Sequence, residues 1–327
     1  MLWELWTFPG YVSRYPSDQG VSTMASTEPL YSQPTMNRIA TIRRLLPTFR
    51  EAVTALAESP SPKFTLIKSF PARDTSNVAP KSKRTMCILD SSYNPPTKAH
   101  MHLALKTFST YHDSLQSNSV NSQTEDVEEG SVEILLLLAT ANADKQPVPA
   151  SYEHRLAMMC LLAQDIRDTF TDSITPPRVN VAITPHARFI DKSADLGASE
   201  VYPQDSTQQV WILGYDTLIR LLDTKYYPPT HTLTPVYDTL LSHNNRIAVF
   251  GRLGSDYGNT GTQTQFFKTV DPRVSERLDT QDSVGDEEIA TISSTSVRKG
   301  VKEDTEAWKA DVCESVAGYI IEEELYR

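Results

Sequence analysis

Two polar segments, far apart in the chain, combine residue types that bind phosphate. The first is Asp90–His100, which follows the apolar run Met86–Leu89 and precedes residues with helical apolar spacing. A strand, a polar turn and a helix start leave free backbone N–H groups pointing at one place, and such a place attracts anions. Thr97 is suited to cap the helix, and the imidazole of His100 in its first turn can reach a phosphate oxygen.

The second segment, Ile292–Arg298, repeats this arrangement near the end of the chain. Three hydroxyl side chains stand at another predicted helix start, and Arg298 follows one turn later. Two polar helix starts, one with a histidine and one with an arginine, suit a ligand that carries several phosphates. The three hydroxyl residues are Ser293, Ser294 and Thr295.

Together, the two segments resemble signature motifs of the nucleotidylyltransferase superfamily. These motifs read Asn-Pro-x-Thr-x-x-His after a first strand and Ile-Ser-Ser-Thr-x-x-Arg late in the chain. The nicotinamide mononucleotide (NMN) adenylyltransferase branch is the most similar, because its eukaryotic members carry Thr at the place of Thr97. The long polar insertions and the stretch Phe189–Ser193 resemble its fungal promoter-of-filamentation type. The resemblance spans roughly Met86 to Lys302, with its strongest parts at both ends.

The resemblance implies an ATP site built from both segments. His100 would contact the α- and β-phosphates, and the late segment would hold the β- and γ-phosphates. Gly214 and Asp216 match a Gly-x-Asp element whose carboxylate bonds a ribose or lies near the adenine; a strand-end turn with a capping Asp is the alternative. Thr97, His100 and Arg298 are the implied catalytic residues. The residues implied for ATP binding are Ser91, Ser92, Tyr93, His100, Gly214, Asp216, Ile292, Ser293, Ser294, Thr295 and Arg298.

The acceptor side of the site matches the family less closely. Lys145 and Arg155 stand where relatives contact the acceptor nucleotide, and the alternative is an exposed lysine and a helix-surface arginine. No Asp-x-Trp-Glu-like element follows the predicted strand at 179–183. Phe189 or His186 is therefore the candidate for stacking on the nicotinamide ring.

By resemblance, the expected reaction transfers the AMP moiety of ATP, bound with Mg²⁺, to nicotinamide or nicotinate mononucleotide. The acceptor phosphate attacks the α-phosphorus in line and gives NAD, or its acid, and pyrophosphate. Because the nucleophile is already anionic, positioning and charge neutralisation suffice for catalysis. Neither a covalent intermediate nor a protein metal site is expected.

Two other functions stay open. A degenerate site would bind or hydrolyse ATP, or transfer a nucleotide to another phosphate acceptor. A non-catalytic regulator would bind nucleotide and act on protein partners through an N-terminal tail and acidic loops. Thr97, His100 and the Ser294–Arg298 stretch favour an enzyme, whereas Ser91, where relatives usually have Gly, favours the other two.

The composition limits the partners. The 327 residues carry a net charge of −10, which argues against nucleic acid or an anionic membrane surface as the main partner. The longest apolar run, Ile134–Ala139, has the length of a strand, and the N-terminus lacks the features of a signal peptide. Cys87, Cys160 and Cys313 are too scattered for a disulfide framework or a zinc site, which indicates a cytoplasmic or nuclear protein.

The pattern of apolar runs predicts an α/β fold. We expect a tail at 1–35, an N-terminal helix and linker at 36–84, and a nucleotidylyltransferase domain at 85–327 with polar insertions at 113–131 and 254–288. Strands alternating with helices predict a doubly wound parallel sheet of the Rossmann-like kind, in three α/β/α layers, with ligands at the carboxyl ends of the strands. Strands are expected at 64–67, 86–89, 132–139, 179–183, 209–213 and 246–251, and helices at 37–58 (divided by Pro47), 97–112, 152–162, 217–222 and 305–325.

Overall fold

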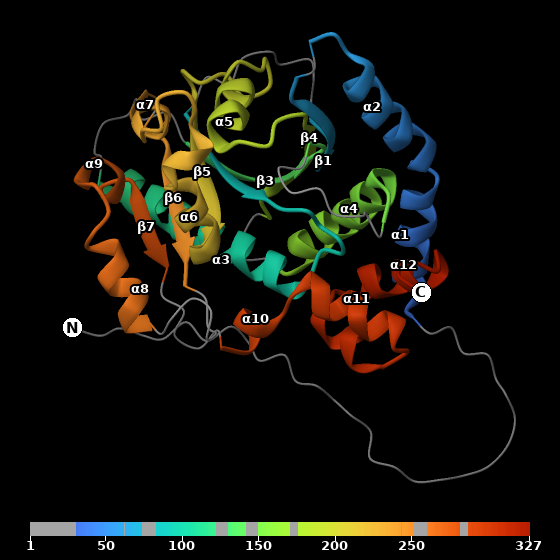
Figure 1. Cartoon of the computed structure of the whole chain (residues 1–327). Coiled ribbons are helices and arrows are strands. Elements are labelled where there is room, and N and C mark those ends of the chain that lie inside the picture. Colours follow the sequence, from blue (N-terminus) through green and yellow to red (C-terminus); the bar gives the residue numbers. More distant parts are fainter. Residues whose placement is uncertain are drawn as a thin grey trace, which may run out of the picture. The chain divides into compact units, whose positions relative to one another are not determined.

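A seven-stranded sheet forms the centre of the computed structural model (Figure 1). The structure describes residues 31–61, 63–73, 83–121, 130–141, 150–170, 176–242, 244–251, 260–281 and 287–327. Residues Tyr31–Arg327 form one compact unit. The strands are β1 (Thr65–Phe70), β2 (Arg84–Asp90), β3 (Ser131–Ala139), β4 (Arg178–Thr184), β5 (Thr207–Gly214), β6 (Arg246–Phe250) and β7 (Leu278–Gln281).

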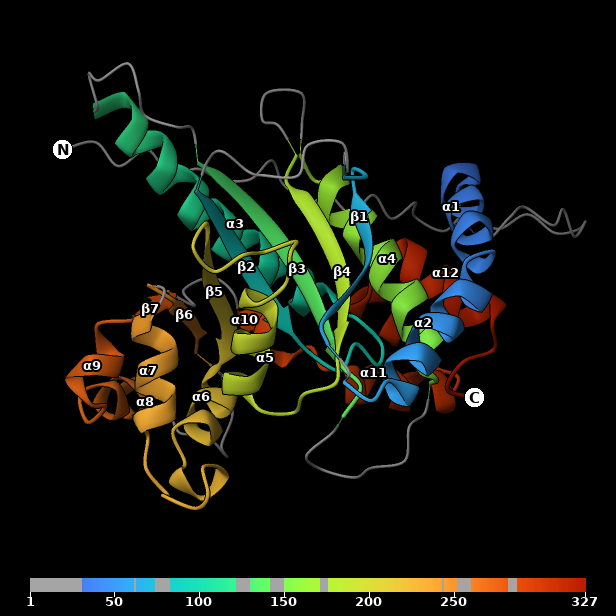
Figure 2. The same cartoon turned by 90° about the horizontal axis from the view of Figure 1, so that it is seen from above.

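The strand order is β1-β4-β3-β2-β5-β6-β7, and Figure 2 shows this order across the sheet. Every neighbouring pair is parallel except β1 and β4, which are antiparallel at one edge. The six parallel strands thus follow the order of the doubly wound Rossmann-like fold, so the predicted fold class is confirmed. The chain reverses its winding direction between β2 and β5, and ligands of such folds bind outside the carboxyl ends of these two strands.

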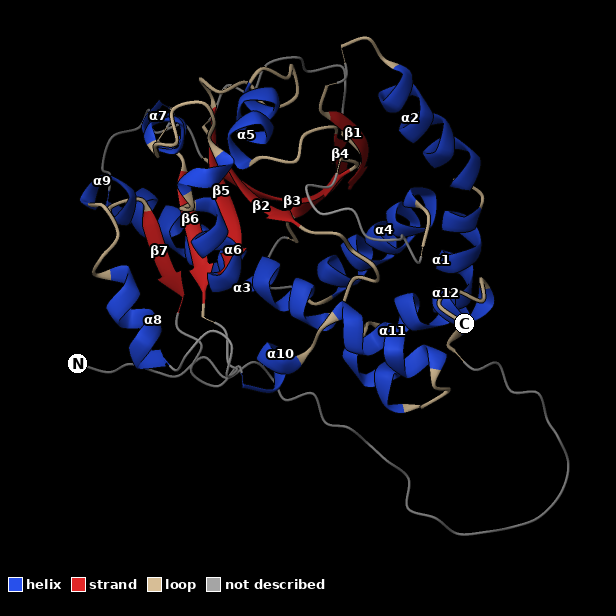
Figure 3. Ribbon diagram, viewed as in Figure 1, coloured by secondary structure: helices blue, strands red, loops and turns tan. Residues whose placement is uncertain are grey.

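Helices cover both faces of the sheet (Figure 3). The alternation along β2 shows why: Cys87 and Leu89 pack into one hydrophobic cluster, whereas Met86 and Ile88 pack into another. The first cluster lies under α1 (Gln33–Arg43), α2 (Leu46–Glu58), α3 (Lys98–Asn121), α4 (Tyr152–Asp168) and α12 (Glu314–Glu322). The second lies under α5 (Phe189–Gly197), α6 (Tyr215–Leu221), α7 (Thr234–Ser242) and α9 (Pro272–Ser275).

The N-terminal region confirms one expectation and corrects another. The run at 37–58 is divided as Pro47 predicts, because α1 ends at Arg43 and α2 begins at Leu46. Helix α1, however, begins at Gln33, inside the expected tail at 1–35. Ser32 caps it by accepting a hydrogen bond from the Thr35 N–H, so a capping serine marks the helix start better than the loss of apolar spacing does.

Helix α3 is longer than predicted. It continues to Asn121 instead of ending at 112, so the polar insertion expected at 113–131 begins as helix. No glycine or proline interrupts it, and serine side chains bond back along the helix, as from Ser114 Oγ to the Thr110 carbonyl at 2.8 Å. The polar composition that begins at residue 113 therefore does not end the helix.

Two further expectations were wrong in detail. The stretch 254–288 contains α8 (Thr260–Phe267), α9, β7 and the start of α10 (Glu287–Thr291), although it was expected to hold little structure. These elements are too short to show periodicity in the sequence. The helix expected at 305–325 is a 3₁₀ helix (Ala307–Asp311) followed by α12, because the chain is extended at Val312.

No helix in the described ranges has the length and apolar character needed to cross a bilayer.

Candidate active site

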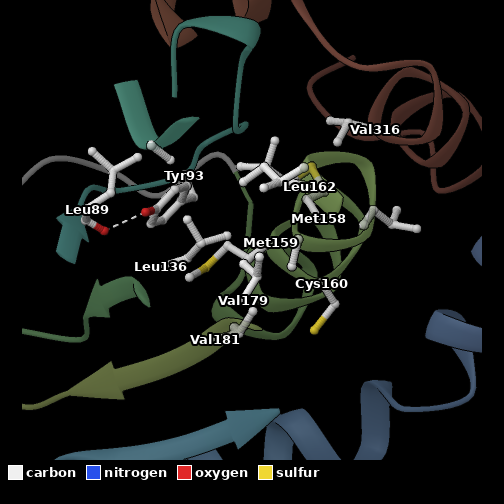
Figure 4. Close-up of a cluster of buried hydrophobic side chains, with 14 of the residues drawn as sticks. Leu89, Tyr93, Leu136, Met158, Met159, Cys160, Leu162, Val179, Val181 and Val316 are labelled. Atoms are coloured by element: carbon white, nitrogen blue, oxygen red, sulfur yellow. Dashed lines mark hydrogen bonds between the residues drawn. The ribbon is translucent and has the colours of Figure 1, made fainter. Parts of the chain in front are cut away.

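The first polar segment, Asp90–His100, forms a turn between β2 and α3, which we call the early turn. It lies at the carboxyl end of β2, beside the point where the winding direction changes. Tyr93 forms its bend, with a φ of 45°, a left-handed conformation that is strained for a bulky side chain. Its fully buried ring packs into the first cluster, and its hydroxyl donates to the Leu89 carbonyl at 2.5 Å (Figure 4). Ser91, where the resemblance usually implies Gly, is not among the described residues with positive φ. The strained position is thus Tyr93, where a buried ring anchors it.

His100 is fixed in one tautomer by the turn that precedes it. Its Nδ1 accepts a hydrogen bond from the Thr97 backbone N–H at 3.0 Å, and an N–H group can only donate. The proton of the neutral ring is therefore on Nε2, which lies 2.8 Å from Ser91 Oγ and donates to it. Burial lowers the pKa of His100 to about 4, so the imidazole is uncharged at neutral pH. The turn thus presents a neutral N–H donor at the start of α3.

The late segment forms the start of α11 (Ser294–Lys302). Ser293 caps this helix by accepting from the Ser296 N–H at 3.1 Å, and the Ile292 N–H bonds to the Ile289 carbonyl. Thr295 is exposed in the first turn, and its Oγ1 accepts from Arg298 Nη2 at 3.1 Å. The second predicted helix start is therefore present, with its hydroxyls at the first turn and its arginine one turn later.

The two segments are bonded directly to each other. Ser294 Oγ donates to the Pro95 carbonyl at 2.7 Å, and Arg298 Nη1 donates to the Asn94 carbonyl at 2.7 Å. The structure thus brings the residues of the late motif against the turn that carries Thr97 and His100. The two segments that the sequence predicts to serve one ligand are therefore in contact, through side chains of the late segment and main-chain oxygens of the early turn.

Arg155 joins the same turn from α4. It is buried rather than on the helix surface, its Nε donates to the Ala150 carbonyl at 3.0 Å, and its Nη1 donates to the Ser92 carbonyl at 3.4 Å. Burial, together with the nearby Arg298, lowers the pKa of Arg155 below its usual value. Two guanidinium groups therefore flank the early turn and make its surroundings attractive to an anion.

Gly214 and Asp216 lie on the other side of the switch point. Gly214 ends β5, the neighbour of β2, and precedes α6, whose first turn contains Asp216. A carboxylate in the first turn of a helix is stabilised by the helix dipole, and Asp216 Oδ2 also lies 3.3 Å from Arg220 Nη2. Both residues stand at a strand end next to the early turn, which agrees with either interpretation of their role.

The structure does not join the predicted acceptor residues to the early turn as a group. The Phe189 ring packs edge-on against Trp211, with ring centres 5.1 Å apart, and it belongs to the second cluster. His186 Nε2 lies 3.5 Å from Asp195 Oδ2. Lys145 lies outside the described residues. Of the predicted acceptor residues, Arg155 alone is placed at the early turn among those that the structure describes.

Sequence reasoning gave no role to three residues next to the site, which are Asn94, Tyr326 and Lys192. Asn94 accepts from Arg298 at its main-chain oxygen and from the Tyr326 hydroxyl at its side-chain oxygen, at 2.7 and 2.9 Å. Lys192, buried on α5, pairs with Asp90 at the end of β2. The stretch Phe189–Ser193 had been singled out, but nothing in the sequence indicated that Lys192 reaches Asp90.

An open pocket of about 650 Å³ adjoins the site along α11. Thr295, Arg298, Lys299 and Lys302 share one face of that helix, by their spacing of three and four residues, and three of them are cationic. Within the described ranges, no three His, Cys, Asp or Glu side chains come together as a metal site. The lining is completed by Glu324, Leu325, Tyr326 and Arg327.

Comparison with known proteins relates part of this chain to an adenylyltransferase. No family model matches the sequence. The chain is 35% identical over 146 residues to a protein of Schizosaccharomyces pombe named "Putative nicotinamide mononucleotide adenylyltransferase". The match covers 45% of this chain and 45% of the relative, so the chain spans less than half of that protein's length.

Two solved structures align with a larger part of the chain. They are Plasmodium falciparum nicotinic acid mononucleotide adenylyltransferase complexed with NaAD and with APC, at 15% and 14% identity. Each covers 74% of this chain, and the alignments include 97% and 96% of those chains, with TM-scores of 0.48 and 0.47. Both TM-scores are below 0.5, so these two structures assign no activity to this chain.

Proposed function

We propose that this protein transfers the AMP moiety of ATP to a pyridine mononucleotide and releases pyrophosphate. The observation that carries the proposal is the contact between the two motifs, in which Arg298 and Ser294 bond to the turn that presents His100. Two helix starts and two guanidinium groups converge there, and such an arrangement suits a triphosphate. The identity over 146 residues to a protein named for this activity supports the same class of reaction.

The chemistry asks little of the protein beyond geometry and charge. The acceptor phosphate is already a nucleophile, so binding both substrates in line and neutralising the charge on the phosphates accelerate the reaction. When ATP binds, the His100 Nε2–H would exchange its bond to Ser91 Oγ for a bond to a phosphate oxygen. The Arg298 guanidinium would donate to the other bridging and terminal phosphate oxygens. Mg²⁺ would arrive bound to the phosphates of ATP and neutralise their charge.

The acceptor is proposed to be nicotinamide or nicotinate mononucleotide, as in the fungal promoter-of-filamentation type that the insertions and Phe189–Ser193 resemble. Its place would be beside ATP at the carboxyl end of β2, on the side of the early turn to which Arg155 bonds. Arg155 is the described cation nearest to this role.

One observation favours a second candidate, a site that binds or hydrolyses ATP without transferring the nucleotide. The Phe189 ring is packed edge-on against Trp211 in the second cluster, so stacking on a nicotinamide would require it to leave that contact. A site without a stacking aromatic would hold ATP and lack a defined acceptor.

The test is to separate the products after incubating purified protein with Mg·ATP and NMN, nicotinate mononucleotide or neither. Transfer predicts dinucleotide and pyrophosphate in equal amounts in at least one acceptor arm, and neither product without acceptor. ADP or AMP formed equally in all three arms identifies the hydrolytic candidate and contradicts the proposal. The Arg298→Ala variant serves as the control for a contaminating enzyme, since it should lose the product.

A further inference from the structure

The last described residues return to the early turn. After α12 the chain bends through Glu324 and Tyr326, with φ values of 50° and 69°, both in the left-handed region that non-glycine residues rarely adopt. This bend directs the Tyr326 side chain to Asn94, whose side-chain oxygen accepts from the Tyr326 hydroxyl at 2.9 Å. Strained backbone that persists in a structure often serves a site, and here it delivers one hydroxyl group to the turn.

The surroundings keep that hydroxyl protonated. Burial raises the pKa of Tyr326 above its usual value, although the neighbouring cations Arg155 and Arg298 act in the opposite direction. A phenol that retains its proton is a donor, which agrees with its bond to the Asn94 oxygen. Tyr326 thus lies near enough to both guanidinium groups to feel their charge and still acts as a neutral donor.

Asn94 is the point where these contacts meet. Its main-chain oxygen accepts from Arg298 and its side-chain oxygen accepts from Tyr326, and the residue is 6% exposed. The next carbonyl, that of Pro95, accepts from Ser294. Three donors from the end of the chain therefore fix the stretch between Tyr93 and Thr97, and Thr97 in turn holds His100 by its N–H.

We propose that Tyr326 is a positioning residue of the phosphate site. Its hydroxyl holds the Asn94 side chain and thereby keeps the early turn in the conformation in which His100 and the start of α3 face the ligand. The inference deepens the proposed function and rests on it, since the ligand is the triphosphate of ATP. Tyr326 also lines the open pocket with Thr295 and Arg298, so a phosphate bound there lies beside it.

The test compares Tyr326→Phe with Tyr31→Phe. Tyr31 is a matched control because its buried hydroxyl has no hydrogen-bond partner among the described residues, and its ring also packs beside α12, at Gly318. The dissociation constant of Mg·ATP is measured by calorimetry, together with KM for each substrate. Loss of one hydrogen bond should weaken ATP binding about five- to tenfold in Tyr326→Phe. KM for the acceptor should stay unchanged, and Tyr31→Phe should bind ATP as the wild type does.

A double-mutant cycle decides whether Tyr326 acts through Asn94. If it does, adding Tyr326→Phe to Asn94→Ala weakens ATP binding no further. Equal affinity of Tyr326→Phe and the wild type would overturn the inference, and so would a full additional loss in the Asn94→Ala background. A wild type that binds Mg·ATP but forms no dinucleotide refutes the proposed transfer, while the binding comparison still tests Tyr326. A wild type that does not bind Mg·ATP refutes both.

Discussion

Arg298 donates from Nη1 to the main-chain oxygen of Asn94 at 2.7 Å, although 204 positions separate the two residues. The bond joins the late motif, Ile292–Arg298, to the early turn. Because the guanidinium carries five N–H donors, one bond to the backbone and one to Thr295 leave others to reach a phosphate. A ligand that bridges the two helix starts would therefore find its arginine already oriented.

His100→Ala should lower turnover by about 10²- to 10³-fold, the usual effect of losing a donor aimed at developing charge. The fold should remain, because removal of the imidazole leaves room for a water that accepts from the Thr97 N–H. Steady-state kinetics of transfer measures the loss. His112→Ala is the matched control on the same helix, where the ring is stacked on Phe108 far from the turn. Unchanged turnover of His100→Ala would exclude His100 from the reaction.

The free protein should show no titration of His100 near pH 6.5. Burial lowers its pKa to about 4, so the ring stays neutral from pH 8 down to about pH 5. Nitrogen NMR of the imidazole gives the measurement, with Nδ1 unprotonated and Nε2 carrying the proton throughout that range. A His100 midpoint near 6.5 would contradict the burial and tautomer derived for it.

The sequence predicted five of the six parallel strands, because these five are apolar runs of ordinary strand length. Ile134–Leu138 and Val210–Leu213, for example, are buried as expected. Strand β7 escaped because its four residues, Leu278–Gln281, include only one apolar side chain. Its place at the edge of the sheet follows from its pairing with β6, which depends on tertiary structure and not on local sequence.

The site was predictable where it depends on local geometry and not where it depends on contacts. Short local patterns in the sequence indicate capping residues and helix starts, so Thr97, Ser293 and Arg298 could be proposed as site residues from the sequence. Nothing local indicates that Arg155 is buried beside the early turn or that Tyr326 reaches Asn94. Those contacts exist only because α4 and the end of the chain pack on the same face of the sheet.

Glu133→Gln should destabilise the fold by about 3–5 kcal/mol, because it removes the carboxylate from a buried ionic cluster. Glu133 Oε2 accepts from Arg73 at 2.5 Å, and its other oxygen lies 3.2 Å from Arg84 Nε and 3.7 Å from Arg178 Nε. Without it, these guanidinium groups would repel one another. The free energy of unfolding in urea measures the loss.

Asp271→Asn provides the control for Glu133→Gln, since solvent screens the pair of Asp271 with Arg273, and this variant should unfold with a free energy close to that of the wild type. Glu133 lies near the amino end of β3, away from the early turn. ATP binding of the folded Glu133→Gln variant at low temperature should therefore equal that of the wild type. A wild-type free energy of unfolding in Glu133→Gln would refute the cluster's role.

Asp165→Asn should become more stabilising as the pH rises. Burial raises the pKa of Asp165 to about 6, despite the hydrogen bond from Ser315 and the nearby Arg38. The pKa of Asp165 is higher in the folded than in the unfolded protein. The wild type therefore has its greatest free energy of unfolding from this group below about pH 4, and loses it as the carboxyl ionises through pH 6. The variant does not ionise, so its free energy of unfolding relative to wild type should rise by about 2–3 kcal/mol between pH 4 and 7. A difference that is constant with pH would contradict this.

The most direct test of the whole account is the binding of Mg·ATP to the wild type, His100→Ala and Arg298→Ala, measured by calorimetry. If the two helix starts hold one triphosphate, the wild type binds one ATP per chain, and each variant loses about 10- to 100-fold in affinity. Arg188→Ala, which removes an exposed arginine paired with Asp191, should bind as the wild type does. Wild-type affinity in either His100→Ala or Arg298→Ala would show that the two turns do not share a ligand.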